Sequence, residues 1–564
     1  METEEILKMK NEIVSQYNKV QKQITDQITE EEIMLPVTDE YRLRTLLFKP
    51  EKFDKPLPTI VVRGCYVQQE EWLLIQMREL AKRGYAGVLQ WCRGTGGSEG
   101  VWQPYIFERN DGLKLMNWLQ EQAWVDSIGL VGASYLALVG WEIADIVPEK
   151  VKTMYLTVLG TEWHESLWQE GEFRQDVYTS WLMSEALRDT TMDYIESAKY
   201  RPQIDVDVDL WHNRLDVYRD FISNPSPDAP YWTDGFWGTV RDVPSKMKIP
   251  VFIGEGWYDI HLGNMLRTYA DLNEESRLHS VVQVNPGNHP MIPVIPGQEK
   301  QEHAAVEEYR RQLQWFRDIL VDHKIPDTSV DFYMIGEDRW RHYNTWPVPV
   351  SEYRSFYLDG GRMIDAADES VESIENGVRE YTYDPDDPVP SHGSGTLFAK
   401  FEGVGSLLQP ETNYRQDVLS YVSDAVKEEL DIVGELQAEL YVQSDAPDTA
   451  FTFKLMEVKP DGTAWNIRDG ITTLGYRNGA KTKQSYDGSP VKITIKAWDI
   501  AYRIPKGSCL RVDISSSNFP EYNAHPNTAE DWAFAKEAKT AKQKILTGKD
   551  YPSRIILPLD NRES

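Results

Sequence analysis

The chain has 564 residues, too many for one ordinary hydrophobic core, so two or three domains are expected. Hydrophobic residues make up 41% and aromatic residues 11%, with 19 Trp, a composition that excludes a disordered chain. The formal net charge of −30 repels nucleic acid, whose binding depends on Lys and Arg neutralising phosphates. We therefore expect no nucleic-acid partner.

The start of the chain and its cysteines predict a reducing, cytoplasmic setting. The first residues, METEEILKMKNEIV, lack the basic region and apolar stretch of a secretory signal. No apolar run approaches the roughly 18 residues of a membrane span, so no membrane partner is expected. The three cysteines, Cys65, Cys92 and Cys509, are an odd and scattered set that argues against a disulfide framework. No Cys/His spacing resembles a zinc site, and neither a metal nor an organic cofactor is expected.

The first predicted element is an amphipathic helix within residues 1–34. Its apolar side chains recur at steps of three and four, namely Ile6, Met9, Ile13, Tyr17, Val20, Ile24 and Ile28. Such a stripe predicts one apolar helix face, which either docks on the body of the same chain or contacts a second copy in a homodimer. Docking on the same chain is the interpretation we favour, because a stripe alone does not choose a partner.

Residues 35–159 and 246–325 show the pattern of a parallel α/β sheet. Short, continuous apolar runs bounded by Gly are typical of strands buried on both faces, and here they alternate with helix-like stretches. The runs are PTIVVRG (58–64), YAGVLQW (85–91), IGLVGAS (128–134), IPVFIGEGWYD (249–259) and SVVQVNPGNH (280–289). This alternation predicts an α/β domain.

Two segments depart from that rhythm. Residues 160–245 are rich in Trp, Tyr and acidic groups and show no clear buried strand, which predicts a helical cap inserted over one edge of the sheet. Residues 326–564 contain short alternating runs, such as ELQAELYVQS (435–444), separated by Asp, Gly and Pro turns. This spacing predicts an all-β domain, a sandwich or jelly roll.

The run LVGASYLALVG (130–140) places Ser134 between a predicted strand and a predicted helix. This is the context of a nucleophile elbow, in which a strained turn lifts the serine oxygen clear of the sheet. Small neighbours, Gly132 and Ala133, allow the helix and strand to approach closely. Leu136 stands where the loose G-x-S-x-G pattern has its second Gly, so this string by itself suits a structural serine equally well.

A serine hydroxyl becomes nucleophilic only when a base takes its proton and an acid orients that base. In α/β-hydrolase sheets the acid and then the histidine follow the serine along the chain, each at the carboxyl end of a strand. Asp259 and His289 end two of the predicted strands in that order. They are therefore predicted to form a catalytic triad with Ser134. His261 is a poorer base because it follows Asp259 too closely.

Several longer stretches resemble the serine-hydrolase family that contains cocaine esterases, X-Pro dipeptidyl peptidases and α-amino-acid ester hydrolases. They are RGTGGSEG (93–100), ERNDGLKLMNWLQEQAWVDSIGLVGASYLA (108–137), GWYDIH (256–261), PGNH (286–289), GEDRWRHYNTWP (336–347), residues 417–462 and LRVDISSSNFPEYNAHPNT (510–528). The resemblance covers nearly everything from about residue 35 to the end. It implies an α/β-hydrolase domain, an inserted helical cap and a C-terminal jelly roll.

The resemblance also implies roles for the site residues. The family's triad maps onto the same three residues, and its oxyanion hole maps onto the backbone N–H of Tyr135 and the hydroxyl of Tyr66. Two positions depart from the family's pattern. Ala137 replaces the last Gly of G-x-S-Y-x-G, where one methyl group should require only a small adjustment. The RGCY loop that carries Tyr66 differs from the more usual Pro-Tyr.

In the predicted cap, the stretch TEWHESLWQEGEF (161–173) combines aromatic and acidic side chains. Aromatic residues expected to line an apolar acyl pocket are Trp163, Trp168 and Trp181. The acidic residues are Glu162, Glu165, Glu170 and Glu172. They either bind the free amine of a substrate, as the resemblance to amino-acid ester hydrolases suggests, or form a solvated face, which we favour because charge runs are usually exposed.

Taken together, the sequence predicts a serine hydrolase that cleaves an ester or amide bond of a small acyl substrate through an acyl-enzyme. An X-Pro dipeptidyl peptidase acting on short peptides, or an amino-acid ester hydrolase or acylase, is the alternative enzyme. A protein of another class, with a silent hydrolase domain and a jelly roll that binds a partner, is disfavoured because all three triad residues are present.

Overall fold

The continuous apolar runs form the centre of a ten-stranded sheet in the computed structural model, which describes residues 3–187, 193–297, 303–393, 395 and 403–561. The strand order is β1-β2-β4-β3-β5-β6-β9-β10-β11-β12, and every pairing from β4 to β11 is parallel. The strands are β1 Ile28–Pro36, β2 Arg42–Pro50, β3 Leu57–Gly64, β4 Ala86–Trp91, β5 Val125–Ala133, β6 Val151–Thr157, β9 Val251–Gly256, β10 Val281–Asn285, β11 Ser329–Met334 and β12 Arg339–Tyr343.

Helices cover this sheet because its central strands are apolar on both sides. Every residue of β4 and of β9 is buried, which requires cover on each face. The helices of this part are α1 Thr3–Val20, α2 Glu70–Ala81, α3 Glu108–Glu121, α4 Tyr135–Trp141, α12 Leu262–Ala270, α13 Glu274–Arg277 and α14 His303–Phe316. Within the described ranges, none of these or the other helices is long and apolar enough to cross a membrane.

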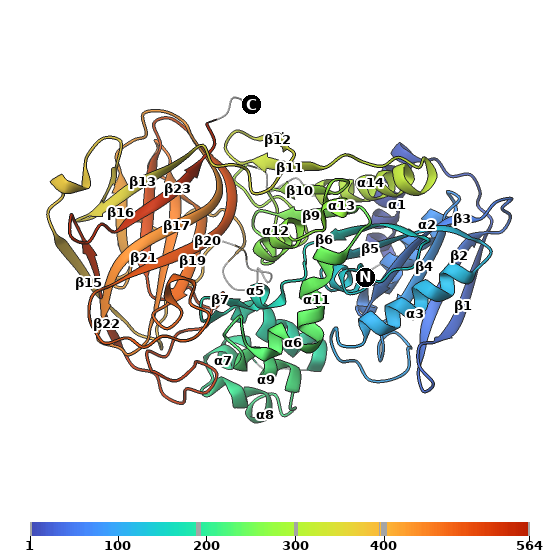
Figure 1. Ribbon diagram of the computed structural model, residues 1–564, viewed down its shortest axis with the longest axis horizontal. Coiled ribbons are helices and arrows are strands. Elements are labelled where there is room, and N and C mark those ends of the chain that lie inside the picture. The colour runs from blue at the N-terminus through green and yellow to red at the C-terminus, as the bar shows by residue number, and fades with distance from the viewer. Residues whose placement is uncertain (1–2, 188–192, 298–302, 394, 396–402, 562–564) are drawn as a thin grey trace.

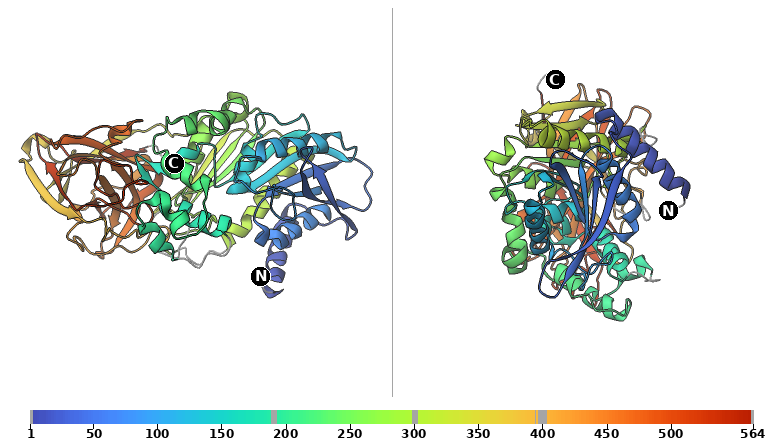
Figure 2. Two further views of the ribbon diagram at one scale, coloured as in Figure 1. Left: turned by 90° about the horizontal axis from the view of Figure 1, so that it is seen from below. Right: turned by 90° about the vertical axis from the view of Figure 1, so that its right-hand side faces the viewer.

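Between β6 and β9 the chain leaves the sheet and forms a helical segment. Its elements are α5 Trp163–Leu167, β7 Trp168–Gln169, β8 Glu172–Phe173, α6 Gln175–Leu187, α7 Tyr194–Lys199, α8 Val206–Asp209, α9 Asp216–Ser223, α10 Pro230–Thr233 and α11 Gly235–Lys246. Figures 1 and 2 show the two large sheets one after the other along the long axis, with these helices beside both, and Ile335 and Tyr502 form a direct bridge between the two parts. The insertion therefore contacts both sheets.

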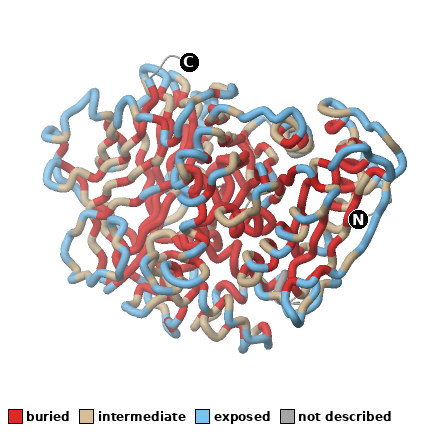
Figure 3. The backbone as a smooth tube through the Cα atoms, turned by 45° about the vertical axis from the view of Figure 1, so that its right-hand side comes forward, coloured by how far each residue is buried: buried red, intermediate tan, exposed pale blue. Residues whose placement is uncertain are grey.

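The alternating runs of the C-terminal half pair into an eleven-stranded, mostly antiparallel sheet that encloses its own core. In β17 buried and partly exposed residues alternate over most of its length, so one face points inward. The strands are β13 Glu352–Asp359, β14 Arg362–Asp365, β15 Gly377–Tyr383, β16 Leu419–Ser423, β17 Leu430–Ser444, β18 Ala450–Val458, β19 Ala464–Thr473, β20 Val491–Ile504, β21 Cys509–Ser515, β22 Ala541–Thr547 and β23 Arg554–Leu559. Figure 3 shows buried positions concentrated in the strands of both sheets.

Two expected boundaries are wrong. In the expected helical region, residues 1–34, the helix ends at Val20, and residues 28–34 belong to β1 because they pair in antiparallel register with β2. Residues 329–343, expected in the β domain, form β11 and β12 of the first sheet instead. Only the parallel pairing of β11 with β10 assigns these residues to the first sheet.

Helix α1 docks on its own chain, where it packs against α2 and α14. Ile13 is fully buried, whereas Leu7 on the same helix is 58% exposed. Replacing Ile13 with Ala should therefore lower the free energy of unfolding by about 2–5 kcal/mol, because the cavity under α1 cannot close completely.

The matched control, Leu7→Ala, should change that free energy by less than about 0.5 kcal/mol. Both are measured by thermal and denaturant unfolding. Equal effects of the two substitutions would contradict the docking of α1 through Ile13.

Candidate active site

Ser134 occupies the turn between β5 and α4, with φ 57° and ψ −126°. A residue with a side chain adopts this left-handed region only under strain. Hydrogen bonds hold the turn on both sides, because the Ser134 N–H donates to Thr157 O at 3.0 Å and the Ala137 N–H donates to Ser134 O at 2.8 Å. The serine is partly exposed at this point, as a nucleophile must be.

The close approach of helix and strand at this turn depends on Gly132. A Cβ added at residue 132 would lie only 2.2 Å from the carbonyl oxygen of Leu136, which belongs to the backbone and cannot move aside. The methyl group of Ala137, by contrast, is fully buried, and this residue still donates its N–H to the turn. The chain therefore accommodates a methyl at residue 137 but has no room for one at residue 132.

Asp259 and His289 are joined by a hydrogen bond of 2.6 Å between Asp259 Oδ2 and His289 Nδ1. The aspartate is fully buried, and its other oxygen accepts the backbone N–H of His261 at 2.6 Å. Because a carboxylate only accepts, Nδ1 of His289 carries the proton and Nε2 keeps its lone pair. The partly exposed imidazole is thus held in the tautomer that a general base requires.

The sheet brings Ser134 and this pair to one edge. Ser134 follows β5, Asp259 follows β9 and His289 follows β10, and these strands are parallel. Only β6 separates β5 from β9, a span of about 10 Å at the usual strand spacing. All three predicted triad residues therefore lie beyond the carboxyl ends of neighbouring strands.

Tyr66 lies just after β3, the neighbour of β5, and its ring is 5.9 Å from that of Tyr135. Its hydroxyl accepts a hydrogen bond from Trp181 Nε1 at 3.1 Å. The hydroxyl proton of Tyr66 therefore points away from Trp181 and can be donated to another group. The Tyr135 hydroxyl is turned into the core, where it accepts the Tyr105 N–H at 3.1 Å. The phenol of Tyr135 is therefore used inside the core, and its backbone N–H lies at the first position of α4, directly after Ser134.

Aromatic rings form a continuous wall from Tyr135 into the helical segment. Tyr105 stacks on Tyr135 at 4.5 Å and contacts Trp163 at 4.9 Å and Trp181 at 6.1 Å. Two of the three tryptophans expected in an acyl pocket thus lie in this wall. Trp168 does not, because it packs on Phe173 inside the helical segment and donates its Nε1–H to a backbone carbonyl there.

His261, dismissed from the sequence as too close to Asp259, lies beside the pair formed by Asp259 and His289. Its ring is 5.5 Å from that of His289, and its Nδ1 is 2.9 Å from Ser166 Oγ of α5. Burial lowers the pKa of His261 well below its usual value, so the ring is neutral. The sequence signal for His261 was its place in the short turn between Asp259 and α12, which begins at Leu262.

The acidic stretch is neither a solvated face nor an open cluster of carboxylates. Glu162 pairs with Arg241 of α11 at 2.6 Å, and Glu165 pairs with Arg267 of α12 at 2.9 Å. The expectation of a solvated face is wrong because the helical segment packs closely between the two sheets and supplies these residues with partners.

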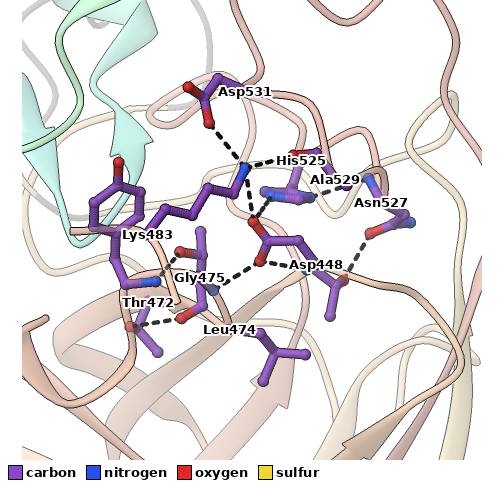
Figure 4. Close-up of polar contacts among 12 residues, drawn as sticks. Asp448, Thr472, Leu474, Gly475, Lys483, His525, Asn527, Ala529 and Asp531 are labelled. Carbon is purple, nitrogen blue, oxygen red and sulfur yellow. Dashed lines mark hydrogen bonds and ion pairs between the residues drawn. The ribbon is translucent and has the colours of Figure 1, made fainter. Parts of the chain in front are cut away.

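Of the other two glutamates, Glu172 is fully buried against the second sheet and Glu170 is partly buried there. Burial raises the pKa of Glu170 to about 7 and that of the fully buried Glu172 well above its usual range. The charges that act on Glu172 belong to Asp448 and Lys483. Figure 4 shows Lys483 between Asp448, at 3.2 Å, and Asp531, at 2.8 Å. This polar cluster lies in the β domain and takes no part in the site around Ser134.

The family model described as X-Pro dipeptidyl-peptidase (S15 family) matches residues 39–290, which include all three triad candidates. A second model, the X-Pro dipeptidyl-peptidase C-terminal non-catalytic domain, matches residues 325–556. A cocaine esterase from Rhodococcus sp. (strain MB1 Bresler) is 27% identical over 577 residues, covering 94% of this chain and 98% of the relative. A putative serine esterase of Mycobacterium tuberculosis is 27% identical over 255 residues, 41% of this chain and 37% of the relative.

Solved structures share the whole architecture. An aminopeptidase from a marine sediment Thaumarchaeota archaeon superposes with a TM-score of 0.79 at 19% identity, over 95% of this chain and 97% of its own. An α-amino acid ester hydrolase superposes with a TM-score of 0.75 at 19% identity, over 94% and 97% of the two chains. These likenesses confirm the predicted fold, an α/β-hydrolase sheet followed by a β domain of the jelly-roll type.

The steric limit at Gly132 yields a test of the turn. Gly132→Ala should distort the backbone at Ser134 and abolish labelling of this serine by a fluorophosphonate probe, because the added Cβ meets backbone atoms. Gly377→Ala is the control, since its Cβ would meet only the side-chain oxygen of Thr547, at 3.1 Å. Labelling is measured by mass spectrometry. Unchanged labelling of a folded Gly132→Ala protein would show that the turn tolerates the methyl group.

Proposed function

This chain belongs to the X-Pro dipeptidyl-peptidase S15 family of serine hydrolases, and on that premise we propose that it cleaves esters of small carboxylic acids through an acyl-enzyme on Ser134. The observation that carries the proposal is the 2.6 Å hydrogen bond between Asp259 and His289, at the sheet edge where the strained turn presents Ser134. No cofactor takes part in the proposed reaction.

In the first half-reaction, the Ser134 oxygen attacks the ester carbonyl while His289 Nε2 takes the serine proton. Asp259 keeps the proton on Nδ1 and stabilises the imidazolium that forms. The carbonyl oxygen becomes an oxyanion, for which we assign two donors, the Tyr135 N–H and the Tyr66 hydroxyl. Collapse of the tetrahedral species breaks the ester bond, and His289 returns the proton to the departing alkoxide.

Water completes the cycle. His289 Nε2 takes a proton from a water molecule, whose oxygen attacks the acyl carbon of the ester formed on Ser134. The same two donors hold the second oxyanion. As the Ser134–acyl bond breaks, the proton passes from His289 to the serine oxygen, and the carboxylic acid leaves. The free enzyme is restored without any other reactant.

An ester substrate is favoured over a peptide with a free N-terminus by the positions of the acidic residues. Release of an X-Pro dipeptide needs a carboxylate that can pair with the substrate's ammonium group. Glu162 and Glu165 are already paired with arginines, and Glu170 and Glu172 are partly and fully buried against the β domain. The peptidase remains the alternative function, supported by the description of the matched family.

Substitution of Ser134 by Ala should lower kcat for p-nitrophenyl acyl esters by about 10⁶-fold, because no nucleophile remains. The wild-type protein should hydrolyse these esters and leave Ala-Pro-p-nitroanilide uncleaved. Steady-state kinetics on both substrate types test both expectations. The control is Ser370→Ala, because Ser370 is an exposed serine.

Activity that survives in Ser134→Ala would remove the proposed nucleophile. Faster cleavage of the peptide anilide than of any ester would leave the nucleophile in place and replace the esterase with the peptidase.

The role assigned to Tyr66 predicts a separate effect. Tyr66→Phe removes one oxyanion donor and keeps the ring, so kcat should fall by about 10²–10³-fold while KM changes little. A fall in substrate affinity alone, with kcat unchanged, would assign Tyr66 to substrate binding instead. Circular dichroism and thermal unfolding verify that the variant is folded.

A further inference from the structure

The β domain reaches the turn that carries Asp259 through one buried arginine. Arg468, on β19, keeps only 4% of its surface exposed. Its Nη2 donates to the backbone oxygen of Trp257, two residues before Asp259, and at 2.9 Å to the backbone oxygen of Asp499 on β20. Both hydrogens of Nη2 are therefore used, one for each part of the chain. The same guanidinium lies over the ring of Tyr258, 5.4 Å from its centroid.

Backbone hydrogen bonds tie the other side of this turn to the loop that carries His289. The N–H of Trp257 donates at 2.9 Å to Asn285 O at the end of β10, and the N–H of Tyr258 donates at 2.9 Å to the loop between β10 and His289. Within the described residues, the donor recorded for Trp257 O is Arg468. The arginine thus holds the carbonyl side of a turn whose N–H side is fixed to the histidine loop.

The place of this turn decides the place of the triad carboxylate. The hydrogen bond from His289 Nδ1 to Asp259 Oδ2 is short, at 2.6 Å, so a small displacement of the turn lengthens it directly. A misplacement of about 1 Å in a catalytic group can cost about 100-fold in rate. Arg468 and Asp259 also line the same small cavity, so the guanidinium and the carboxylate lie around one space.

Arg468 is not needed to join the two sheets. The Ile335 N–H donates to Ala501 O at 3.1 Å and the Arg503 N–H donates to Ile335 O at 2.7 Å, so backbone bonds already link β20 to the end of β11. A fully buried guanidinium loses its hydration, which makes it an unfavourable choice for a purely structural link. Its contacts with Trp257 and Tyr258 instead point to a task at the turn.

We propose that Arg468 is a positioning residue for the triad, through which the β domain holds the turn of Asp259 and so fixes the carboxylate against His289. The arginine acts through Asp259 and not on the substrate. This inference rests on the proposed acyl-enzyme at Ser134 and goes beyond it. It gives a part in catalysis to a domain whose family model is described as non-catalytic.

Arg468→Met keeps a long apolar stem and removes both the donor and the charge. Its kcat for p-nitrophenyl acyl esters should fall by about 10–100-fold, because the acid that orients the base is no longer held, while KM stays within about twofold. Arg468→Lys keeps a cation with N–H donors and should recover part of the lost kcat. Steady-state kinetics measure both values.

Arg511→Met is the matched control. Arg511 is 2% exposed and also donates to backbone oxygens, those of Pro410 at 2.6 Å and Glu411 at 3.2 Å, but all of these lie in the β domain. Its loss should lower the melting temperature and leave kcat unchanged. Thermal unfolding and circular dichroism verify the fold of each variant.

A second readout needs no substrate. The proton on His289 Nδ1 lies in a short hydrogen bond to a carboxylate, so its NMR resonance should appear far downfield, and His289→Gln identifies it by its absence. In Arg468→Met this resonance should move upfield or broaden, and in Arg511→Met it should not change. A lower overall stability does not move it as long as the protein is folded.

Wild-type kcat with an unchanged resonance in folded Arg468→Met overturns the assignment. A rise in KM alone also overturns it, as does an equal fall of kcat in Arg511→Met, because that result would reflect general loosening of the β domain. Where Arg468→Met does not fold, Arg468→Lys decides by the same two measurements. A lower kcat with unchanged KM and a shifted resonance then supports the assignment, and wild-type values reject it.

Failure of the inference and failure of the proposed function are distinguishable. Labelling of Ser134 by a fluorophosphonate in the wild type tests the nucleophile independently of Arg468. Labelling, together with a kcat and a resonance that do not respond to Arg468→Met, removes the role of this arginine alone. Absence of labelling in the wild type removes the acyl-enzyme and the inference with it.

Discussion

The hydrogen bond between Asp259 and His289 is the contact on which the arrangement of the site depends. It joins the ends of β9 and β10, which are neighbours in the sheet and parallel, so that their carboxyl ends lie side by side. Full burial removes Asp259 from water, and the backbone N–H of His261 satisfies its second oxygen. A carboxylate held in this way orients the imidazole without competing for solvent.

The helical segment completes the site from the opposite side. It contributes Trp163, Trp181 and Ser166. The ion pair of Glu165 with Arg267 joins it to α12, whereas Glu162 pairs with Arg241 of α11 inside the segment. Its turn between β7 and β8 is buried against the β domain. Both sheets thus fix the segment that forms the aromatic wall, although only one of them carries the triad candidates. A rigid, water-poor wall strengthens each polar contact within it.

Where sequence reasoning went wrong, pairing between distant segments had overridden a local pattern. Ile24 and Ile28 continue the apolar stripe of the N-terminal helix, yet Ile24 is 68% exposed and Ile28 begins β1. Ile28 is drawn into β1 by its antiparallel pairing with Pro50 of β2, which the helical spacing does not reveal. The acidic run of residues 162–172 was misjudged for the same reason, because its arginine partners come from α11 and α12, and charge alone predicts exposure.

The sequence by itself determined five strands of the first sheet, the strand-to-helix turn at Ser134 and the places of Asp259 and His289 after two of those strands, because each depends on residues close together in the chain. Strand burial, small residues at a tight turn and polar residues at strand ends are local signals. Tertiary structure alone decided that His261 lies beside His289, that Trp181 bonds Tyr66 and that Trp168 turns away from the wall. These facts depend on side chains from separate elements meeting in space, which no spacing along one chain encodes.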